Sequence, residues 1–327
     1  MGHSSATTVS ILLLLVVSAQ AWPYYQNFQQ FDPFRQSRDV HDNTVDTTDS
    51  IIGHLAHLAG QLYGEPNNET GLKVAEWHEG MNVNPEELGE YVEGDILFPT
   101  AIVGRNGVKA ETARWPDGVI PYIMSPFFNQ KQRRVIFEAM DDYHKYTCIR
   151  FKEYKGEESD YIRITAGNTG CWSAVGRVGG RQDVNLQVPG CVTKKGTIIH
   201  ELMHAVGFLH EQSRYERDNY VSIQWHNIQR GRETNFEKSQ RSTTDALGVG
   251  YDYGSVMHYS ANAFSRNGQP TIVPREPRNI LDFIAEIFQG NRNARIGQRD
   301  GLSTKDIQKI RRMYKCAKRR RSSSFFF

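Results

Sequence analysis

The sequence has few cysteines and no long hydrophobic run, and both shortages exclude classes of protein. No stretch of the 327 residues approaches the ~20 consecutive apolar residues of a transmembrane helix, so we expect no membrane span. The four cysteines form no Cys-x-x-Cys pair, so a zinc site made of cysteines is not expected. They are Cys148, Cys171, Cys191 and Cys316. The net charge of +2 is small, and we expect no nucleic acid partner.

The longest apolar run lies at the start of the chain. Residues 11–17 are all apolar, and the small-residue sequence Ala-Gln-Ala follows at residues 19–21. This pattern predicts a secretory signal peptide over residues 1–21 and an extracellular protein. An oxidising destination makes disulfides the natural use of the cysteines, and four cysteines allow three pairings.

The chemistry is concentrated in the string TIIHELMHAVGFLHEQSRYERD at residues 197–218. His200 and His204 are four residues apart with no helix breaker before Gly207, so on a helix both imidazoles leave the same face. Gly207 lets the chain leave the helix, and His210 can then supply a third nitrogen ligand. Three protein ligands leave one coordination position for water, which is typical of a catalytic zinc, and we expect one ion per chain.

Glu201 follows the first histidine and has the carboxylate needed to take a proton from that water. The alternative is a helix with three ordinary histidines. The full pattern HExxHxxGxxH argues against this alternative, because it fixes five positions and is the metzincin signature. That signature also calls for a Met-turn downstream, and the sequence SVMHY stands at residues 255–259.

Together, HELMHAVGFLHEQSRYERD and SVMHY resemble the astacin family of zinc endopeptidases. The resemblance implies that Tyr259 is a further zinc ligand that swings away to stabilise the transition state, and that Met257 forms a hydrophobic floor below the metal. It also implies the pairs Cys171–Cys191 and Cys148–Cys316. Glu216 departs from the family pattern, which has aspartate there, and we expect this to affect local packing rather than activity.

The fold implied is α+β: a metzincin (zincin-like) catalytic domain of two subdomains, with a small mixed β-sheet, two long helices and an active-site cleft between the subdomains. We place this astacin-like domain at residues 106–316. Apolar periodicity predicts a strand over 119–124 and a helix over 129–146, and a capping box at 303–306 predicts a terminal helix. Shorter strands are predicted at 149–151, 161–164 and 184–188.

Residues 22–105 differ from the rest of the chain in charge. They contain 14 acidic and 4 basic residues, whereas the remainder contains 23 acidic and 35 basic residues. This complementarity is expected if the segment is an inhibitory propeptide that lies on the domain, although solvated charge is the alternative. The sequence YVEGDI at 91–96 resembles the astacin propeptide motif, with Val92 in place of phenylalanine. The resemblance implies that Asp95 ligates zinc in place of water; a plain acidic loop is the alternative.

Activation would follow from a cut between Arg105 and Asn106 by a trypsin-like protease. The resemblance implies that the new amine of Asn106 is buried near Glu211. Trp172 lies in a stretch that resembles the edge strand on which an extended substrate pairs. Arg299 lies in a loop resembling one that places an arginine under the first primed pocket, where it would favour Asp or Glu; a surface salt bridge is the alternative.

The sequence therefore predicts a secreted zinc endopeptidase of extracellular proteins or peptides, made as a zymogen, inhibited by its own propeptide and monomeric. Asn68 is a candidate N-glycosylation site. Another metzincin branch is the first alternative, but a matrix-metalloproteinase-like zymogen needs a propeptide cysteine. The second is a catalytically silent, metal-organised binding protein at glycan-rich surfaces that uses the basic tail 317–327, which we expect to be disordered. An intact Glu201 argues against it.

Overall fold

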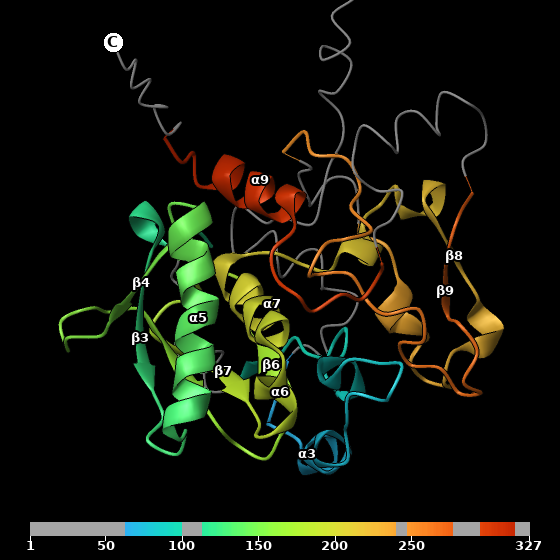
Figure 1. Cartoon of the computed structure of the whole chain (residues 1–327), viewed down its shortest axis with the longest axis horizontal. Coiled ribbons are helices and arrows are strands. Elements are labelled where there is room, and N and C mark those ends of the chain that lie inside the picture. The colour runs from blue at the N-terminus through green and yellow to red at the C-terminus, as the bar shows by residue number, and fades with distance from the viewer. Residues whose placement is uncertain (1–62, 100–112, 240–246, 277–294, 318–327) are drawn as a thin grey trace, which may run out of the picture. The chain divides into compact units, whose positions relative to one another are not determined.

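The computed structural model describes residues 63–99, 113–239, 247–276 and 295–317 (Figure 1). The predicted signal peptide, the expected cleavage site at Arg105 and Asn106, and all but the first residue of the basic tail lie outside these residues. All described residues belong to one unit of the chain, 39–327. Among their helices, none has both the length and the apolar character needed to cross a membrane.

A five-stranded mixed sheet forms the first half of the domain. Its order is β4-β3-β5-β7-β6, and every neighbouring pair is parallel except β6 with β7. The strands are β3 (Val119–Met124), β4 (Arg150–Glu153), β5 (Tyr161–Thr165), β6 (Cys171–Ser173) and β7 (Arg181–Leu186). In β5 the side chains alternate, with Ile162 and Ile164 fully buried, so one face of the strand packs into the core.

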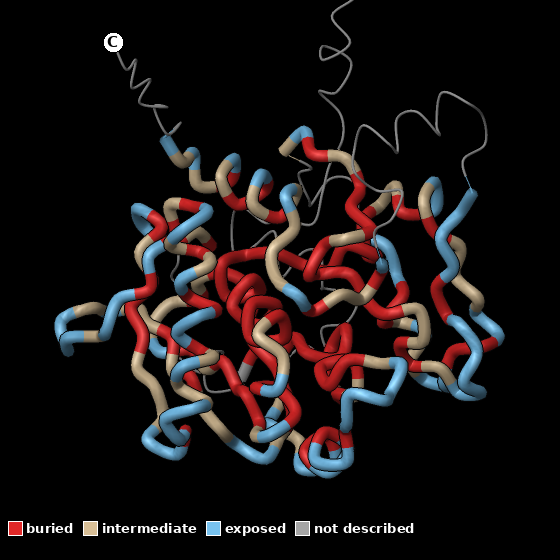
Figure 2. Tube along the Cα trace, viewed as in Figure 1, coloured by how far each residue is buried: buried red, intermediate tan, exposed pale blue. Residues whose placement is uncertain are grey.

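Two helices complete this core, α5 (Gln130–Tyr146) and α7 (Lys195–Val206). The helix α5 begins with a capping box and turns Ile136 and Met140 inward, as the periodicity predicts. The hydroxyl of Tyr143 donates to the Ile199 carbonyl oxygen at 2.7 Å and joins the two helices. In Figure 2 α7 is buried along its length, because it lies between this core and the second half of the domain.

The second half, residues 208–313, has few regular elements within its described ranges. They are β8 (Val221–Ile223) and β9 (Ile272–Pro274), which pair antiparallel, and the terminal helix α9 (Thr304–Met313). Short 3₁₀ turns lie at Glu211–Ser213, Arg217–Asn219, Trp225–Asn227 and Glu233–Phe236. The predicted capping box of α9 is present, and the disulfides Cys148–Cys316 and Cys171–Cys191 are the pairs that the resemblance implied. The first joins the end of α9 to the sheet half.

Residues 63–99, which belong to the predicted propeptide and are called the pro-segment below, run along the domain. The segment contains β1 (Tyr63–Gly64), α3 (Asn68–Ala75), the 3₁₀ turn η2 (Pro85–Leu88) and β2 (Phe98–Pro99). Ile96 forms a parallel bridge with Ser173 in the edge strand β6. The sheet half also has α6 (Gly190–Thr193) and the turn η3 (Pro116–Gly118). The pro-segment therefore occupies the strand edge where we expected substrate to pair.

Candidate metal centre

Three histidines converge from the end of α7 and the turn that follows it. His200 and His204 leave one face of the helix, and Gly207, with φ of 123°, ends it. His210 then returns to the same place, so that ligand atoms of the three histidines and Asp95 all lie within 4.8 Å of one another. Each of these side chains is fully or almost fully buried.

The outer ring nitrogens are held so that the inner nitrogens can bind a metal. His200 Nδ1 lies 2.7 Å from the carbonyl oxygen of Val256, and His204 Nδ1 lies 2.7 Å from that of Phe208. Because a carbonyl can only accept, both Nδ1 atoms carry the proton and both Nε2 lone pairs face the cluster. His210 differs, because its Nδ1 lies 2.6 Å from a carboxylate oxygen of Glu93 in the pro-segment.

Asp95 reaches all three histidines. Its Oδ2 lies 2.9 Å from His200 Nε2 and 3.3 Å from His210 Nε2, and its Oδ1 lies 3.4 Å from His204 Nε2. Asp95 Oδ1 and His204 Nε2 are buried without a hydrogen-bond partner among the described residues. Buried polar atoms of this kind are costly unless something binds them, and three imidazoles with one carboxylate are a donor set that zinc prefers. The residues present therefore fit a zinc ion.

The electrostatics of the cluster favour a cation. Burial, with a smaller contribution from Arg299, lowers the pKa of His200 to about 4, so this imidazole is neutral and available as a ligand. Burial also acts to lower the pKa of His210, but the carboxylates of Asp95 and Glu93 raise it to about 10. A position that binds a proton this tightly without metal is one where a divalent cation can replace it.

Glu201 lies on α7 directly after the first histidine and is completely buried. Within the part of the chain that the structure describes, neither of its carboxylate oxygens has a hydrogen-bond partner. Burial, followed by the nearby Asp95 carboxylate, raises the pKa of Glu201 well above its usual range. A carboxyl group in this setting can accept a proton and hold it, as a general base requires.

The Met-turn supports the cluster from below. Val256 holds His200 through its carbonyl oxygen, and Met257 is buried in the same apolar core as α7. The Tyr259 hydroxyl donates to the carbonyl oxygen of Glu93 at 2.6 Å. The residue expected as a further ligand is thus bound to the pro-segment here.

Glu211 is buried in an ion cluster at the start of the second half. Its carboxylate pairs with Lys309 and lies 3.0 Å from Arg214 Nη1, and it accepts from the Asp252 amide at 2.8 Å. Burial opposes ionisation, but Lys309 and Arg214 lower the pKa of Glu211 to about 2. Its expected partner, the amine of Asn106, lies outside the described residues. The sequence analysis did not predict Lys309 as a partner of Glu211. Its position next to the inward-facing Ile310 of α9 is a signal from which its burial could have been predicted.

The two candidate substrate residues are covered by the pro-segment. Trp172 packs edge to face against Tyr91, with ring centroids 6.1 Å apart. Arg299 is 4% exposed, and its Nε donates to the carboxylate of Glu86. The alternative of a surface salt bridge is therefore wrong for Arg299. The role of Glu86 was also missed, since only the excess of acidic residues in this segment was visible in the sequence.

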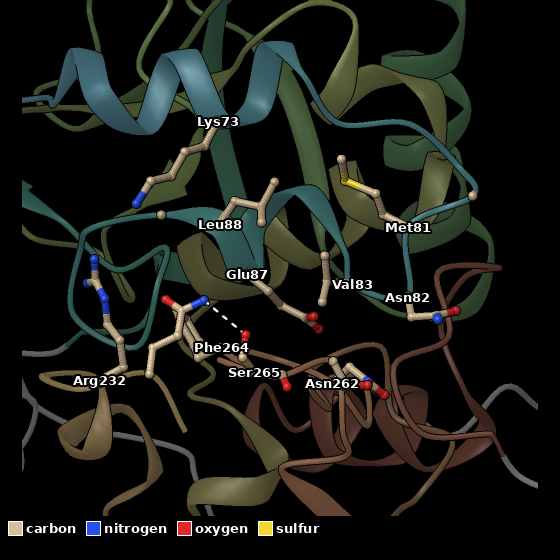
Figure 3. Close-up of a pocket in the computed structure, with 14 residues that line it drawn as sticks. Lys73, Met81, Asn82, Val83, Glu87, Leu88, Arg232, Asn262, Phe264 and Ser265 are labelled. Carbon is tan, nitrogen blue, oxygen red and sulfur yellow. Dashed lines mark hydrogen bonds between the residues drawn. The ribbon is translucent and has the colours of Figure 1, made fainter. Parts of the chain in front are cut away.

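One cavity beside the pro-segment is not lined by the residues of the metal cluster. This cavity of about 430 Å³ lies between the pro-segment and the second half (Figure 3). Lys73 and Leu88 line one side, and Arg232 and Phe264 line the other. Lys73 and Arg232 both pair with Glu90, so ionic contacts join the two sides at this cavity.

Comparison with known proteins agrees with this geometry. The model of the peptidase family described as "Astacin" matches residues 107–315. Zinc metalloproteinase nas-13 of Caenorhabditis elegans is 44% identical over 234 residues, which are 72% of this chain and 48% of the relative. Zinc metalloproteinase nas-4 of the same species is 38% identical over 272 residues, which are 77% of this chain and 81% of the relative.

A solved structure is similar as well. High choriolytic enzyme 1, a hatching enzyme zinc-protease from the medaka fish Oryzias latipes, is 39% identical with a TM-score of 0.53. The match covers 62% of this chain and 94% of that one. The chain spans about half the length of nas-13 but most of nas-4.

Proposed function

The chain belongs to the astacin family of zinc peptidases, and from this premise we propose that it is a secreted endopeptidase, made as a zymogen, that cleaves extracellular proteins. One observation carries the proposal. Asp95 of an acidic segment meets all three histidines of the signature in one buried cluster. The same carboxylate explains both how a metal is held and how the uncut chain is kept inactive.

The chemistry divides between the metal and the protein. A bound zinc ion supplies Lewis-acid activation of water and of the scissile carbonyl. His200, His204 and His210 would hold it through Nε2. Glu201 takes the proton from the attacking water on a carboxylate oxygen and later passes it to the leaving amine. The Tyr259 hydroxyl, once free of Glu93, can donate a hydrogen bond to the oxyanion on the substrate.

Inhibition and activation follow from the pro-segment. While Asp95 occupies the cluster and Ile96 pairs with Ser173, neither water nor an extended peptide has access. A trypsin-like cut after Arg105 would break the covalent link between the segment and the domain. The signal peptide, secretion, glycosylation at Asn68 and a monomeric state belong to the same proposal, and the oxidised cysteine pairs are consistent with an extracellular destination.

A preference for Asp or Glu on the primed side is supported by the surroundings of Arg299. Its guanidinium is buried in the cleft and already binds a carboxylate, that of Glu86. A cationic group in such a site binds acidic side chains through charge-assisted hydrogen bonds. The cleavage products of a whole-proteome digest would show acidic residues enriched after the cut, and no enrichment would remove this part of the proposal.

The substitution Glu201→Gln tests the catalytic role. The amide keeps the size of the side chain but cannot accept the proton, so we expect loss of peptide cleavage on the order of 10²–10⁴-fold with zinc still bound. Metal content and peptide cleavage are measured before and after trypsin treatment. Glu138→Gln, on the exposed side of α5, is the matched control and should keep full activity. Substantial turnover by the cut Glu201→Gln variant would refute the role.

A further inference from the structure

Two adjacent glutamates of the pro-segment are buried in the cleft away from the metal ligands. Glu86 and Glu87 lie in the turn η2 and are 1% and 2% exposed. Glutamate is almost never this buried unless it is paired. The cluster of His200, His204, His210 and Asp95 does not include them. Metal binding therefore does not explain why Glu86 and Glu87 are buried.

Their partners come from three separate parts of the domain. The carboxylate of Glu86 accepts from Arg299 Nε, and Thr197 Oγ1 at the start of α7 lies 3.4 Å away. Glu87 accepts from the backbone amide of Ser260 at 2.7 Å and from its hydroxyl at 2.5 Å. The side chain of Asn84, which precedes the turn, donates to the Gly297 carbonyl oxygen at 3.2 Å.

The guanidinium of Arg299 is oriented by backbone carbonyls and left open toward carboxylates. Its Nη1 donates to the carbonyl oxygens of His258 at 3.1 Å and of Gln298 at 2.7 Å. Its Nη2 is buried without a hydrogen-bond partner in the described ranges, and the carboxylate oxygen of Glu87 is 4.0 Å away. Glu86 is thus the carboxylate that directly binds this buried charge, and removing it leaves the arginine without a directly bound counter-charge.

The turn that holds the glutamates is in direct contact with the turn that holds Asp95. A Cβ atom on Gly89 would lie 1.7 Å from the carbonyl oxygen of Gly94, so only glycine allows this approach. The amide of Gly94 donates to the Tyr91 carbonyl oxygen at 2.9 Å and closes the second turn. The contact of the pro-segment at Arg299 is therefore linked to its contact at the metal ligands.

We propose that Glu86 is a second anchor of the pro-segment, which occupies the pocket of Arg299 with its carboxylate and holds the segment in the cleft independently of the metal. This inference rests on the proposed function, since it names a regulation of the same site. A cut after Arg105 leaves the ion pair intact. Release of the pro-segment is then a step separate from cleavage of the chain.

Hydrogen exchange of the full-length, metal-free chain tests the anchor. The amides of Glu87 and Gly89 donate to the carbonyl oxygens of Asn84 and Glu86, so their exchange rates report on η2. We expect Glu86→Gln to accelerate their exchange at least tenfold, because the buried arginine loses its counter-charge. Exchange in β3 and β5 should be unchanged, and Glu79→Gln, an exposed position of the same segment, should match the wild-type chain.

A double substitution distinguishes the ion pair from general loosening. If Glu86 acts through Arg299, the chain with Glu86→Gln and Arg299→Gln exchanges no faster in η2 than the chain with Glu86→Gln alone. If Glu86→Gln also accelerates hydrogen exchange in the sheet, the milder variant Glu86→Asp is measured instead. Acceleration of exchange that is confined to residues 84–89 supports the anchor, and exchange at the wild-type rate overturns it. Exchange within twofold of wild type in Glu86→Gln overturns it as well. A cut wild-type chain that has been freed of the pro-segment and is still inactive would refute the proposed function and leave this result unchanged.

Discussion

The two halves of the domain differ in the interactions that stabilise each of them internally. Residues 113–206 form a sheet and two helices around an apolar core. Residues 208–313 contain one pair of short strands and one helix in their described part, and buried charges take a large part in their packing. Arg214, for example, is fully buried, donates to the Val249 carbonyl oxygen at 3.0 Å and lies over the ring of Tyr251.

The two halves also supply different residues to the site. The sheet half supplies two of the histidines and Glu201 from one buried helix, where apolar packing fixes their positions. The second half supplies Tyr259 and Arg299, and the pro-segment binds both through hydrogen bonds. Groups held by polar contacts can exchange one partner for another. Tyr259 and Arg299 therefore lie in the half whose packing depends more on polar contacts.

Removing each disulfide in turn would show the largest difference between the halves. Cys148 and Cys316 are 168 residues apart and join the halves, whereas Cys171 and Cys191 are 20 residues apart within the sheet half. From loop-closure entropy we expect the loss of the longer link to lower the free energy of unfolding by about 5 kcal/mol and the loss of the shorter link by about 3 kcal/mol. Denaturant unfolding of the paired alanine variants measures both.

The elements in which hydrogen exchange accelerates are a second readout of the same variants. Without Cys148–Cys316, hydrogen exchange should accelerate in α9 while β3 and β5 stay protected, since α9 loses its covalent link to the sheet half. Without Cys171–Cys191, the change should be confined to β6 and its neighbours. Equal losses of stability, or loosening of the sheet in the first variant, would show that the halves depend on one another more than their cores indicate.

The difference between apolar and polar packing also explains which features could be predicted from the sequence. The strand predicted over 119–124 and the helix predicted over 129–146 match β3 and α5 closely, because apolar periodicity is a local signal. The three histidines could also be predicted from the sequence, since the spacing of His200 and His204 on one helix and of His210 after Gly207 fixes their geometry. The partners Lys309 and Glu86 could not, because each lies about a hundred residues from its partner, or further, and depends on how separate segments pack.

Asp306 provides a pH test of the polar half. It accepts from the Ser255 hydroxyl at 2.6 Å and the Val256 amide at 2.9 Å, and burial together with Asp252 raises its pKa to about 6. The unfolded chain releases this proton near pH 4 and the folded chain near pH 6, so Asp306 destabilises the fold as pH rises between them. The expected loss is roughly 2–3 kcal/mol over this interval.

Asp306→Asn isolates this effect, because the amide keeps the shape and does not titrate. The difference in unfolding free energy between wild type and variant should fall from pH 4 to pH 6 and be constant above. Asp183→Asn is a suitable control in the sheet half, where its carboxylate pairs with Arg163 at a partly exposed site. A flat difference for Asp306→Asn would mean that the pKa of Asp306 is the same in the folded and the unfolded chain.

The smallest expected effect concerns His210, the one histidine of the cluster that is oriented by the pro-segment. His200 and His204 are oriented by backbone carbonyls, whereas His210 is oriented by Glu93, whose other oxygen accepts from the Ser213 hydroxyl at 3.0 Å. Loss of such an outer partner typically weakens metal binding 10- to 100-fold. We expect Glu93→Gln to lower the zinc affinity of the uncut chain about tenfold, because the amide is a weaker acceptor for the Nδ1 proton.

Competition with a chelator measures this affinity, and the processed protein provides the internal control. After the cut at Arg105 and removal of the pro-segment, position 93 is absent, so wild type and Glu93→Gln should bind zinc equally. Glu79→Gln should behave as wild type in both forms. Equal affinity of the two uncut chains would show that His210 is positioned as firmly as the two helical histidines. The contrast between the halves would then not extend to the metal ligands.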